Sequence, residues 1–151
     1  MYPFFVSLHM GDTPDYSKSE AFCGGSLIHK QIVLTAAHCR VFFGRDANNP
    51  LTDVLPQVRL GLHRRLETDP TKYVERLAVE MVIFQDYPAK GNRDDIMMLL
   101  LDKPAPDNFK PITLPTADVP VGTGLTLVGF GRLNSGGEAI LPERLQIALS
   151  S

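Results

Sequence analysis

Apolar residues recur at every second position through much of this chain, and this period restricts it to β-structure. In residues 4–10, the side chains of Phe4, Val6, Leu8 and Met10 fall on one face of an extended strand. Further strands are predicted within residues 25–36 (two strands joined by a polar turn at 29–31), 57–62, 96–102, 125–130 and 144–149.

The segment 73–84 fits two periods. Leu77, Val79, Met81 and Ile83 alternate as in a strand, whereas Val74, Leu77, Ala78 and Met81 follow helical spacing. Its content of β-branched residues favours a strand.

Four segments rich in Pro, Gly, Asn and Asp separate these strands and are predicted loops: 43–53, 67–72, 86–95 and 103–111. Many short strands with such connections predict an all-β barrel or sandwich. The Pro-rich stretch from Lys103 to Pro120 is the best candidate for a linker.

Composition excludes some classes of function. With 17 acidic and 15 basic residues the net charge is −2, and no basic block supports nucleic-acid binding. The longest strongly apolar run, 96–101, is far shorter than the roughly 20 residues of a membrane-spanning helix. Met1 is followed at once by Tyr2 and Pro3, so we expect no signal peptide within these residues.

His38, in the segment TAAHC, is a candidate general base, because an imidazole titrates near neutral pH. Such a base needs a fixed tautomer, which a carboxylate on its other nitrogen supplies. Asp95 precedes the apolar run 96–101 and is the candidate carboxylate. The small residues Ala36 and Ala37 would let it approach the backbone, and we expect their N–H groups to bind it.

The two cysteines, Cys23 and Cys39, are compatible with one bridge or with two free thiols. A bridge would pin the turn that carries His38 and remove roughly 3 kcal/mol of denatured-state entropy. A zinc site of Cys23, His29, His38 and Cys39 is disfavoured, because adjacent residues make poor joint ligands and the spacing fits no common finger.

Several segments together resemble trypsin-like (chymotrypsin-fold) serine proteases, and they occur in that family's order along nearly the whole chain. These segments are YPFFVSL, FCGGSLIHKQIVLTAAHC, VRLGLH, RDDIMMLLL and LTLVGFGR. The resemblance implies an all-β fold: a chymotrypsin-like first six-stranded antiparallel barrel (1–103), a crossover linker (104–120) and the opening strands of an incomplete second barrel (121–151).

The resemblance also implies roles for particular residues. His38 corresponds to the catalytic histidine and Asp95 to the aspartate that orients it, while Cys23 and Cys39 correspond to a disulfide around the histidine loop. Tyr87 and Phe22 correspond to substrate-contacting positions. No metal or other cofactor is implied, and Leu62 stands where calcium-binding members carry a Glu.

The family's nucleophile motif, Gly-Asp-Ser-Gly-Gly-Pro, is absent from these residues. Ser135, in NSGG, follows GFGR too closely and lacks the preceding Gly-Asp, and Ser26 is expected in a strand beside the bridge. The resemblance thus implies a serine endopeptidase chain that carries the His and Asp of a triad, lacks the Ser, and is inactive alone.

The implied partners are a polypeptide substrate or the missing C-terminal half of the protease domain, with no nucleic acid and no membrane. The implied location is extracellular. Two alternatives stay open: a non-catalytic binding or regulatory module derived from a protease, and a fragment read from an incomplete gene model.

Overall fold

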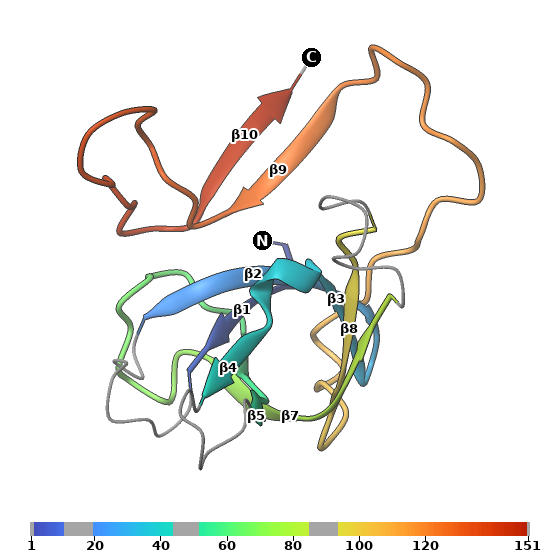
Figure 1. Cartoon of the computed structure of the whole chain (residues 1–151), viewed down its shortest axis with the longest axis vertical. Helices are drawn as coiled ribbons and strands as arrows, with labels where there is room; N and C mark the ends of the chain where they lie inside the picture. The colour runs from blue at the N-terminus through green and yellow to red at the C-terminus, as the bar shows by residue number, and fades with distance from the viewer. Residues whose placement is uncertain (1, 11–19, 44–51, 85–93, 151) are drawn as a thin grey trace.

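Six antiparallel strands close into a barrel in the computed structural model of the chain, which describes residues 2–10, 20–43, 52–84 and 94–150 (Figure 1). In order around the barrel they are β1 (Phe5–His9), β2 (Ala21–His29), β3 (Ile32–Thr35), β8 (Met97–Leu101), β7 (Val74–Ile83) and β6 (Gln57–Leu60), and β6 pairs again with β1. The predicted all-β class and the six-stranded antiparallel barrel are confirmed.

The run 96–101 shows how the barrel uses the period-two pattern. Met97, Leu99 and Leu101 of β8 are at most 1% exposed, whereas Met98 and Leu100 are 39% and 38% exposed. The continuous apolar stretch therefore supplies only alternate side chains to the core. Strand β7 covers 74–83, which settles the ambiguous segment as a strand, as its β-branched content predicted.

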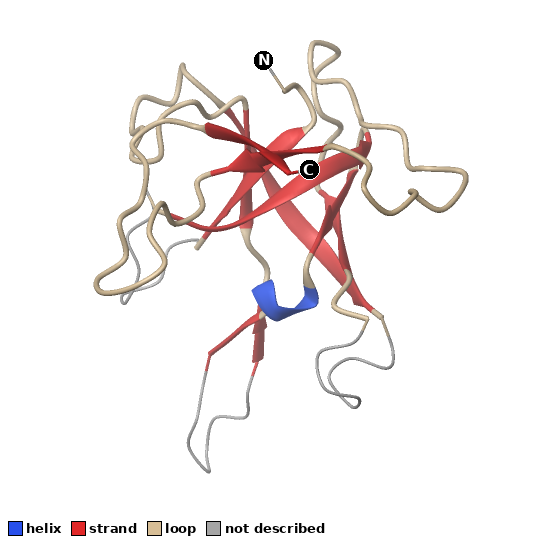
Figure 2. Cartoon of the chain, turned by 90° about the horizontal axis from the view of Figure 1, so that it is seen from above, coloured by secondary structure: helices blue, strands red, loops and turns tan. Residues whose placement is uncertain are grey.

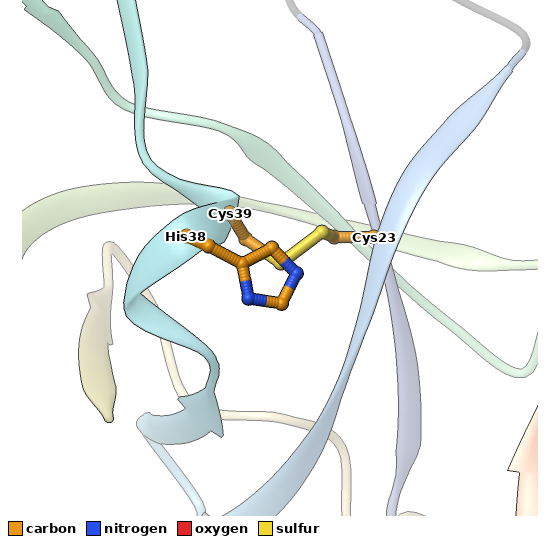
Figure 3. A group of neighbouring side chains, drawn as sticks. All are labelled: Cys23, His38 and Cys39. Carbon is orange, nitrogen blue, oxygen red and sulfur yellow. A yellow bond between two sulfur atoms is a disulfide. The ribbon is translucent and has the colours of Figure 1, made fainter. Parts of the chain in front are cut away.

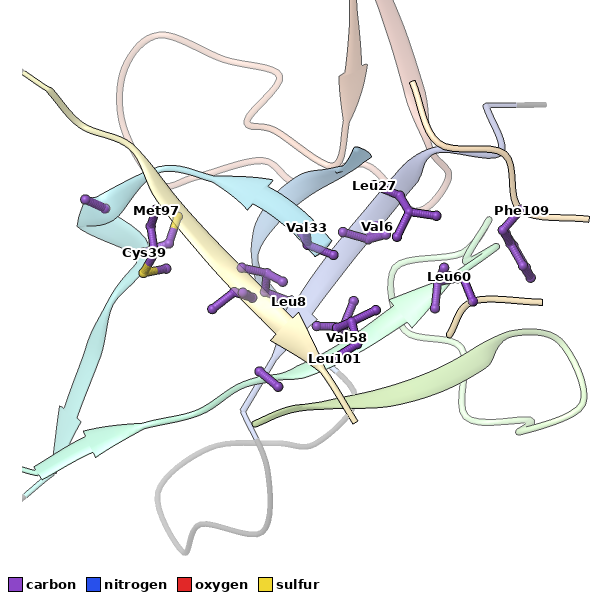
Figure 4. Packing of buried hydrophobic residues seen from close by; sticks show 14 residues of the cluster. Val6, Leu8, Leu27, Val33, Cys39, Val58, Leu60, Met97, Leu101 and Phe109 are labelled. Carbon is purple, nitrogen blue, oxygen red and sulfur yellow. The ribbon is translucent and has the colours of Figure 1, made fainter. Parts of the chain in front are cut away.

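The core of the barrel is formed by inward-facing aliphatic side chains from all six strands (Figure 4). Val6, Leu8, Leu27, Val33 and Val58 are fully buried. At one end of the barrel Phe109 covers the core, and its ring lies 3.1 Å from where a Cβ on Gly61 would stand. Gly61 has φ +79°, so this turn favours glycine for both conformation and space.

Two short strands were not predicted. β4 (Val41–Phe43) and β5 (Thr52–Val54) pair antiparallel and take both ends of the range 43–53, for which the sequence predicts a loop. Three-residue strands are too short to show a period, so neighbouring Gly, Asn and Pro residues dominated the prediction. The hairpin projects from the barrel beyond the only helical segment drawn in Figure 2.

Residues 105–112 follow β8 and lie along the barrel. The amide of Ala105 donates to the carbonyl of Lys30 at 2.7 Å, and that of Ile112 donates to Leu27 at 2.8 Å. Beyond them the chain crosses to a separate hairpin of β9 (Leu125–Gly129) and β10 (Gln146–Ser150), seen above the barrel in Figure 1.

The β9–β10 hairpin is tied to the barrel near its turn. The amide of Arg65 donates to Glu143 at 2.8 Å and that of Leu145 donates to His63 at 3.0 Å. Its apolar side chains are largely uncovered: Leu127 is 59% exposed and Leu149 is 84% exposed. In the part of the chain that the structure describes, no helix is long and apolar enough to cross a membrane.

Candidate active site

His38 lies on a single 3₁₀ turn, Ala37–Cys39, that directly follows β3. The amide of Cys39 donates to Ala36 at 3.1 Å and that of Arg40 donates to Ala37 at 3.0 Å, which closes the turn. The side chains of Ala37 and Cys39 point into the core, so the residue between them faces outward. The His38 side chain is accordingly 63% exposed.

A disulfide joins the turn to the barrel wall. Cys39 is bonded to Cys23 of β2, with a Cα–Cα distance of 6.2 Å, and the His38 ring lies beside the bridge (Figure 3). The part of the chain described here holds no free cysteine. The bridge restricts the backbone on which the imidazole is carried.

Asp95 binds His38 with both carboxylate oxygens. Oδ1 accepts the backbone N–H of His38 at 2.8 Å, and Oδ2 lies 2.6 Å from ring nitrogen Nδ1. A carboxylate can only accept, so Nδ1 carries the proton and the neutral ring presents Nε2 as a bare acceptor. This is the tautomer that a general base requires.

The local backbone aims the Asp95 carboxylate. Asp94 has φ +60°, a left-handed conformation that Asp tolerates better than most residues, and it turns the chain just before β8. The amide of Ile96 donates to the carbonyl of Asp94 at 2.7 Å and closes the turn. Met97 then enters the core, so the segment is anchored on its far side.

The pKa of the Asp95 carboxyl is lowered from its usual value. The largest cause is the hydrogen bond from the His38 side chain, followed by the bond from the His38 amide, and the Ala37 amide adds the least. We expected the amides of Ala36 and Ala37 to be the donors. The main backbone donor is His38 itself, because the 3₁₀ turn directs that N–H toward β8.

Two supports of the histidine turn could not be predicted from the sequence. Arg40 makes a two-pronged ion pair with Asp53 of β5, at 2.6 and 2.7 Å, just after the turn. Thr35 donates its hydroxyl to the Gly24 carbonyl at 2.8 Å, just before it. Neither pair has a sequence signal, because each joins separate elements through ordinary polar residues.

The other two predicted site residues are Phe22 and Tyr87. Phe22 lies on β2, partly buried, and lines a cleft of about 580 Å³ between the barrel and β9. Opposite it are Thr126, Leu127 and Phe130. Tyr87 lies outside the described residues.

The disfavoured zinc site is only partly assembled. Ligand atoms of Cys23, His38 and Cys39 lie within 4.8 Å of one another, but both sulfurs are committed to the disulfide. His29 is apart from this group, where its Nδ1 accepts the Gln31 amide at 3.3 Å.

Neither candidate serine was expected to be the nucleophile, and their surroundings differ. Ser135 is exposed in the 130–145 connection, which is organised around Asn134 and its bonds to Gly136 and Glu138. Ser26 is a strand residue of β2, paired with Phe5. Among the described residues, none forms a hydrogen bond with Nε2 of His38.

The chain is similar to proteins of one known family. The family model of trypsin matches residues 1–150. The chain is 31% identical over 124 residues to thrombin-like enzyme agkihpin-1 of Gloydius halys, covering 80% of this chain and 46% of that protein. It is 35% identical over 126 residues to a snake venom serine protease of Crotalus durissus durissus, covering 80% and 44%.

Solved structures show the same fold. The atomic-resolution structure of HBP superposes with a TM-score of 0.74 at 26% identity, over 99% of this chain and 59% of that one. Neuropsin, a serine protease expressed in the limbic system of mouse brain, gives 0.73 at 24% identity, over 98% and 58%. The chain spans less than half the length of these two curated relatives. The chymotrypsin-like fold is thus confirmed, and the chain belongs to the trypsin family of serine proteases.

Proposed function

We propose that this chain supplies the general base and the orienting carboxylate of a serine endopeptidase. The observation that carries the proposal is the double contact of Asp95 with His38, at 2.8 and 2.6 Å. An aspartate that only ends a solvated turn would not be expected to bind both the backbone amide and the ring of one histidine. The substrates are polypeptides, as the family implies.

In the proposed reaction, His38 Nε2 takes the proton of a serine hydroxyl as that oxygen attacks the peptide carbonyl. The imidazolium then gives the proton to the leaving amine, and Asp95 stabilises its charge. The serine is supplied by polypeptide beyond these 151 residues. Without it, and without donors for the oxyanion, the chain alone lacks both covalent and electrostatic catalysis.

The division of the chain follows from the same proposal. Residues 1–103 form the first barrel, 104–120 the crossover, and 121–151 the start of a second barrel. The uncovered apolar side chains of the β9–β10 hairpin, such as Leu127 and Leu149, support this division, because further strands would bury them. Phe22 and Tyr87 are the residues proposed to contact the substrate, as the family resemblance implies.

The protein acts in an extracellular compartment. The Cys23–Cys39 bridge supports this location, because disulfides persist in oxidising surroundings. The name of the Crotalus durissus durissus relative, a snake venom serine protease, supports it as well.

The test is complementation. The chain is refolded together with a polypeptide covering the portion of a venom serine protease that it does not match. We expect labelling by a serine-directed fluorophosphonate and hydrolysis of fluorogenic peptides. Replacing His38 by Ala should reduce hydrolysis by at least about 10⁴-fold. The exposed His63 gives the matched control, and its replacement by Ala should leave the rate unchanged.

A folded two-part complex that neither labels nor hydrolyses would contradict the peptidase proposal. That outcome would favour the second candidate, a non-catalytic binding module. The 580 Å³ cleft beside Phe22 is the surface that such a module would offer.

A further inference from the structure

The histidine turn is held differently on its two sides. Upstream the chain comes from β3, which pairs with both β2 and β8 in the barrel wall. Downstream it leaves at Arg40 and enters β4, which pairs with β5 alone among the described strands. The β4–β5 hairpin projects away from the barrel (Figure 2), and an isolated two-stranded hairpin is only marginally stable in water. The strand pairing of the barrel therefore supports the turn on one side only.

An ion pair between Arg40 and Asp53 joins the end of the turn to β5. Nε and Nη2 of Arg40 donate to the two carboxylate oxygens of Asp53 at 2.6 and 2.7 Å. Two parallel charge-assisted bonds fix the orientation of the groups as well as their distance. The pKa of the Asp53 carboxyl is lowered, chiefly by the hydrogen bond from Arg40, so the pair is ionised at neutral pH.

The main chain of Arg40 holds one end of a peptide group whose other end is held by Asp95. The amide of Arg40 donates to the carbonyl oxygen of Ala37 at 3.0 Å. The amide of His38 donates to Asp95 Oδ1 at 2.8 Å. That carbonyl and that N–H belong to the same planar peptide unit, between Ala37 and His38. A rotation of this plane at its oxygen end therefore also turns the N–H away from Asp95.

We propose that Arg40 and Asp53 are positioning residues for the His38–Asp95 pair. The ion pair keeps the Arg40 amide on the oxygen of the peptide before His38, and this keeps the N–H of the same peptide directed at Asp95. The aspartate is thereby held where its second oxygen meets the ring. The effect on catalysis rests on the proposed function, whereas the effect on the imidazole is measured in the chain itself.

The test measures the contact of Asp95 with His38 directly. The first readout is the exchange of the His38 Nδ1 proton with water, followed by NMR of the ¹⁵N-labelled ring. The second is the pKa of Asp95, followed by carboxyl ¹³C NMR. Arg40→Gln and Asp53→Asn each remove one charge of the pair. Each should accelerate the exchange by about 2- to 30-fold, the range for coupling through contiguous contacts.

The Asp95 pKa should rise toward its usual value in both variants, because its lowering comes first from the His38 ring and then from the His38 amide. Arg40→Lys keeps the charge but loses the two-pronged geometry, so it should give an intermediate exchange rate. A change confined to the stability of the hairpin would move neither readout.

Two further variants separate the ion pair from other causes. The double variant Arg40→Gln/Asp53→Asn should change both readouts about as much as either single variant, because all three lose the same contact. Arg64→Gln is the matched control, since Arg64 forms an ion pair with Glu143 between segments outside the histidine turn. It should leave the exchange rate and the Asp95 pKa unchanged.

A purely structural ion pair would give a different result. Arg40→Gln and Asp53→Asn would then lower the Tm, while the proton exchange and the Asp95 pKa stayed as in the unmodified chain. That result would overturn the proposal, as would additive effects in the double variant or equal changes in Arg64→Gln. Circular dichroism checks that the barrel is folded. If Arg40→Gln unfolds it, Arg40→Lys decides, and an unchanged exchange rate in that variant refutes the proposal.

In a complemented enzyme, Arg40→Gln should lower kcat by about the same 2- to 30-fold and leave KM unchanged, because the pair acts on the base rather than on substrate binding. A raised KM with unchanged kcat would contradict the positioning role. If no complemented chain is active, the peptidase proposal fails, and the NMR readouts still decide whether the ion pair positions His38.

Discussion

The carboxylate of Asp95 holds both the main chain and the imidazole of His38, with one oxygen on each. The two contacts, 2.8 Å to the amide and 2.6 Å to Nδ1, join the end of β3 to the start of β8. The ring cannot rotate without losing one bond, and the turn cannot shift without losing the other. Tautomer and position are therefore set by the same side chain.

Replacing Asp95 by Asn should disturb the His38 tautomer while leaving the barrel folded. An amide can accept with its oxygen or donate with its nitrogen, so the ring is no longer held with its proton on Nδ1. ¹⁵N NMR of the imidazole should show a protonated Nδ1 and a bare Nε2 in the unmodified chain and a mixture in the variant. In a complemented enzyme, kcat should fall by about 10⁴-fold.

Asp94→Asn is the matched control, because Asn also tolerates the left-handed backbone at φ +60°. It should leave the His38 spectrum unchanged. An Asp95→Asn spectrum identical to that of the unmodified chain would show that the carboxylate does not set the tautomer.

The lowered pKa of Asp95 predicts a pH-dependent contribution to stability. Because the folded pKa lies below the unfolded value of about 3.9, the contribution is complete above that pH and is lost as the pH falls through the folded pKa. Carboxyl ¹³C NMR should show this titration. In His38→Ala the Asp95 pKa should rise toward its usual value but not reach it, because the backbone N–H still donates.

Asp69 supplies an internal reference for that experiment. Its pKa is lowered by hydrogen bonds from Thr71, first from the amide and then from the hydroxyl, and should not respond to His38→Ala. If the pKa values of Asp69 and Asp95 shifted equally, the change would be global rather than a property of the His38 contact.

The parts of the fold that could be predicted are those with a local signal in the sequence. β8 was predicted because residues 96–101 form a short continuous apolar run, and β7 because β-branched residues favoured a strand where the periodicity was ambiguous. β4 and β5 were missed because three residues carry no period. Their pairing is fixed by contacts between segments, such as that of Arg40 with Asp53.

The candidate site shows the same limit at the level of single atoms. The motif around His38 and the aspartate before the apolar run identified the two partners. They did not identify which amide would meet Asp95: Ala36 and Ala37 were expected, and His38 is the main donor. The direction of one N–H depends on how a 3₁₀ turn is placed against another strand, and spacing along the chain does not encode it.

A pair of neighbouring leucines tests the alternation in β8. Leu99 is fully buried and Leu100 is 38% exposed on the opposite face. Leu99→Ala should lower the free energy of unfolding by about 2–5 kcal/mol, whereas Leu100→Ala should lower it by about 0.5 kcal/mol. Urea unfolding followed by circular dichroism measures both, and similar losses would mean that the strand is not oriented as described.

Gly25 tests how closely β2 approaches β3 and β1. A Cβ at this position would lie 2.8 Å from Val33 Cγ1 and 3.0 Å from the Leu34 carbonyl oxygen. Both neighbours are held in the barrel wall, so Gly25→Ala should reduce the free energy of unfolding by about 1–3 kcal/mol. Gly136→Ala is the control, because no atom beyond its chain neighbours lies within 4 Å of the added Cβ. It should change the free energy of unfolding by about 0.5 kcal/mol or less.

A double substitution separates the steric cause at Gly25 from a general loss of flexibility. Val33→Ala removes the nearest methyl carbon, Cγ1, and creates space beside position 25. In the Val33→Ala background, Gly25→Ala should therefore cost less than in the unmodified chain. A coupling of about 0.5 kcal/mol or more would establish the contact. Strict additivity of the two losses would show that the approach of the two strands is not what requires glycine there.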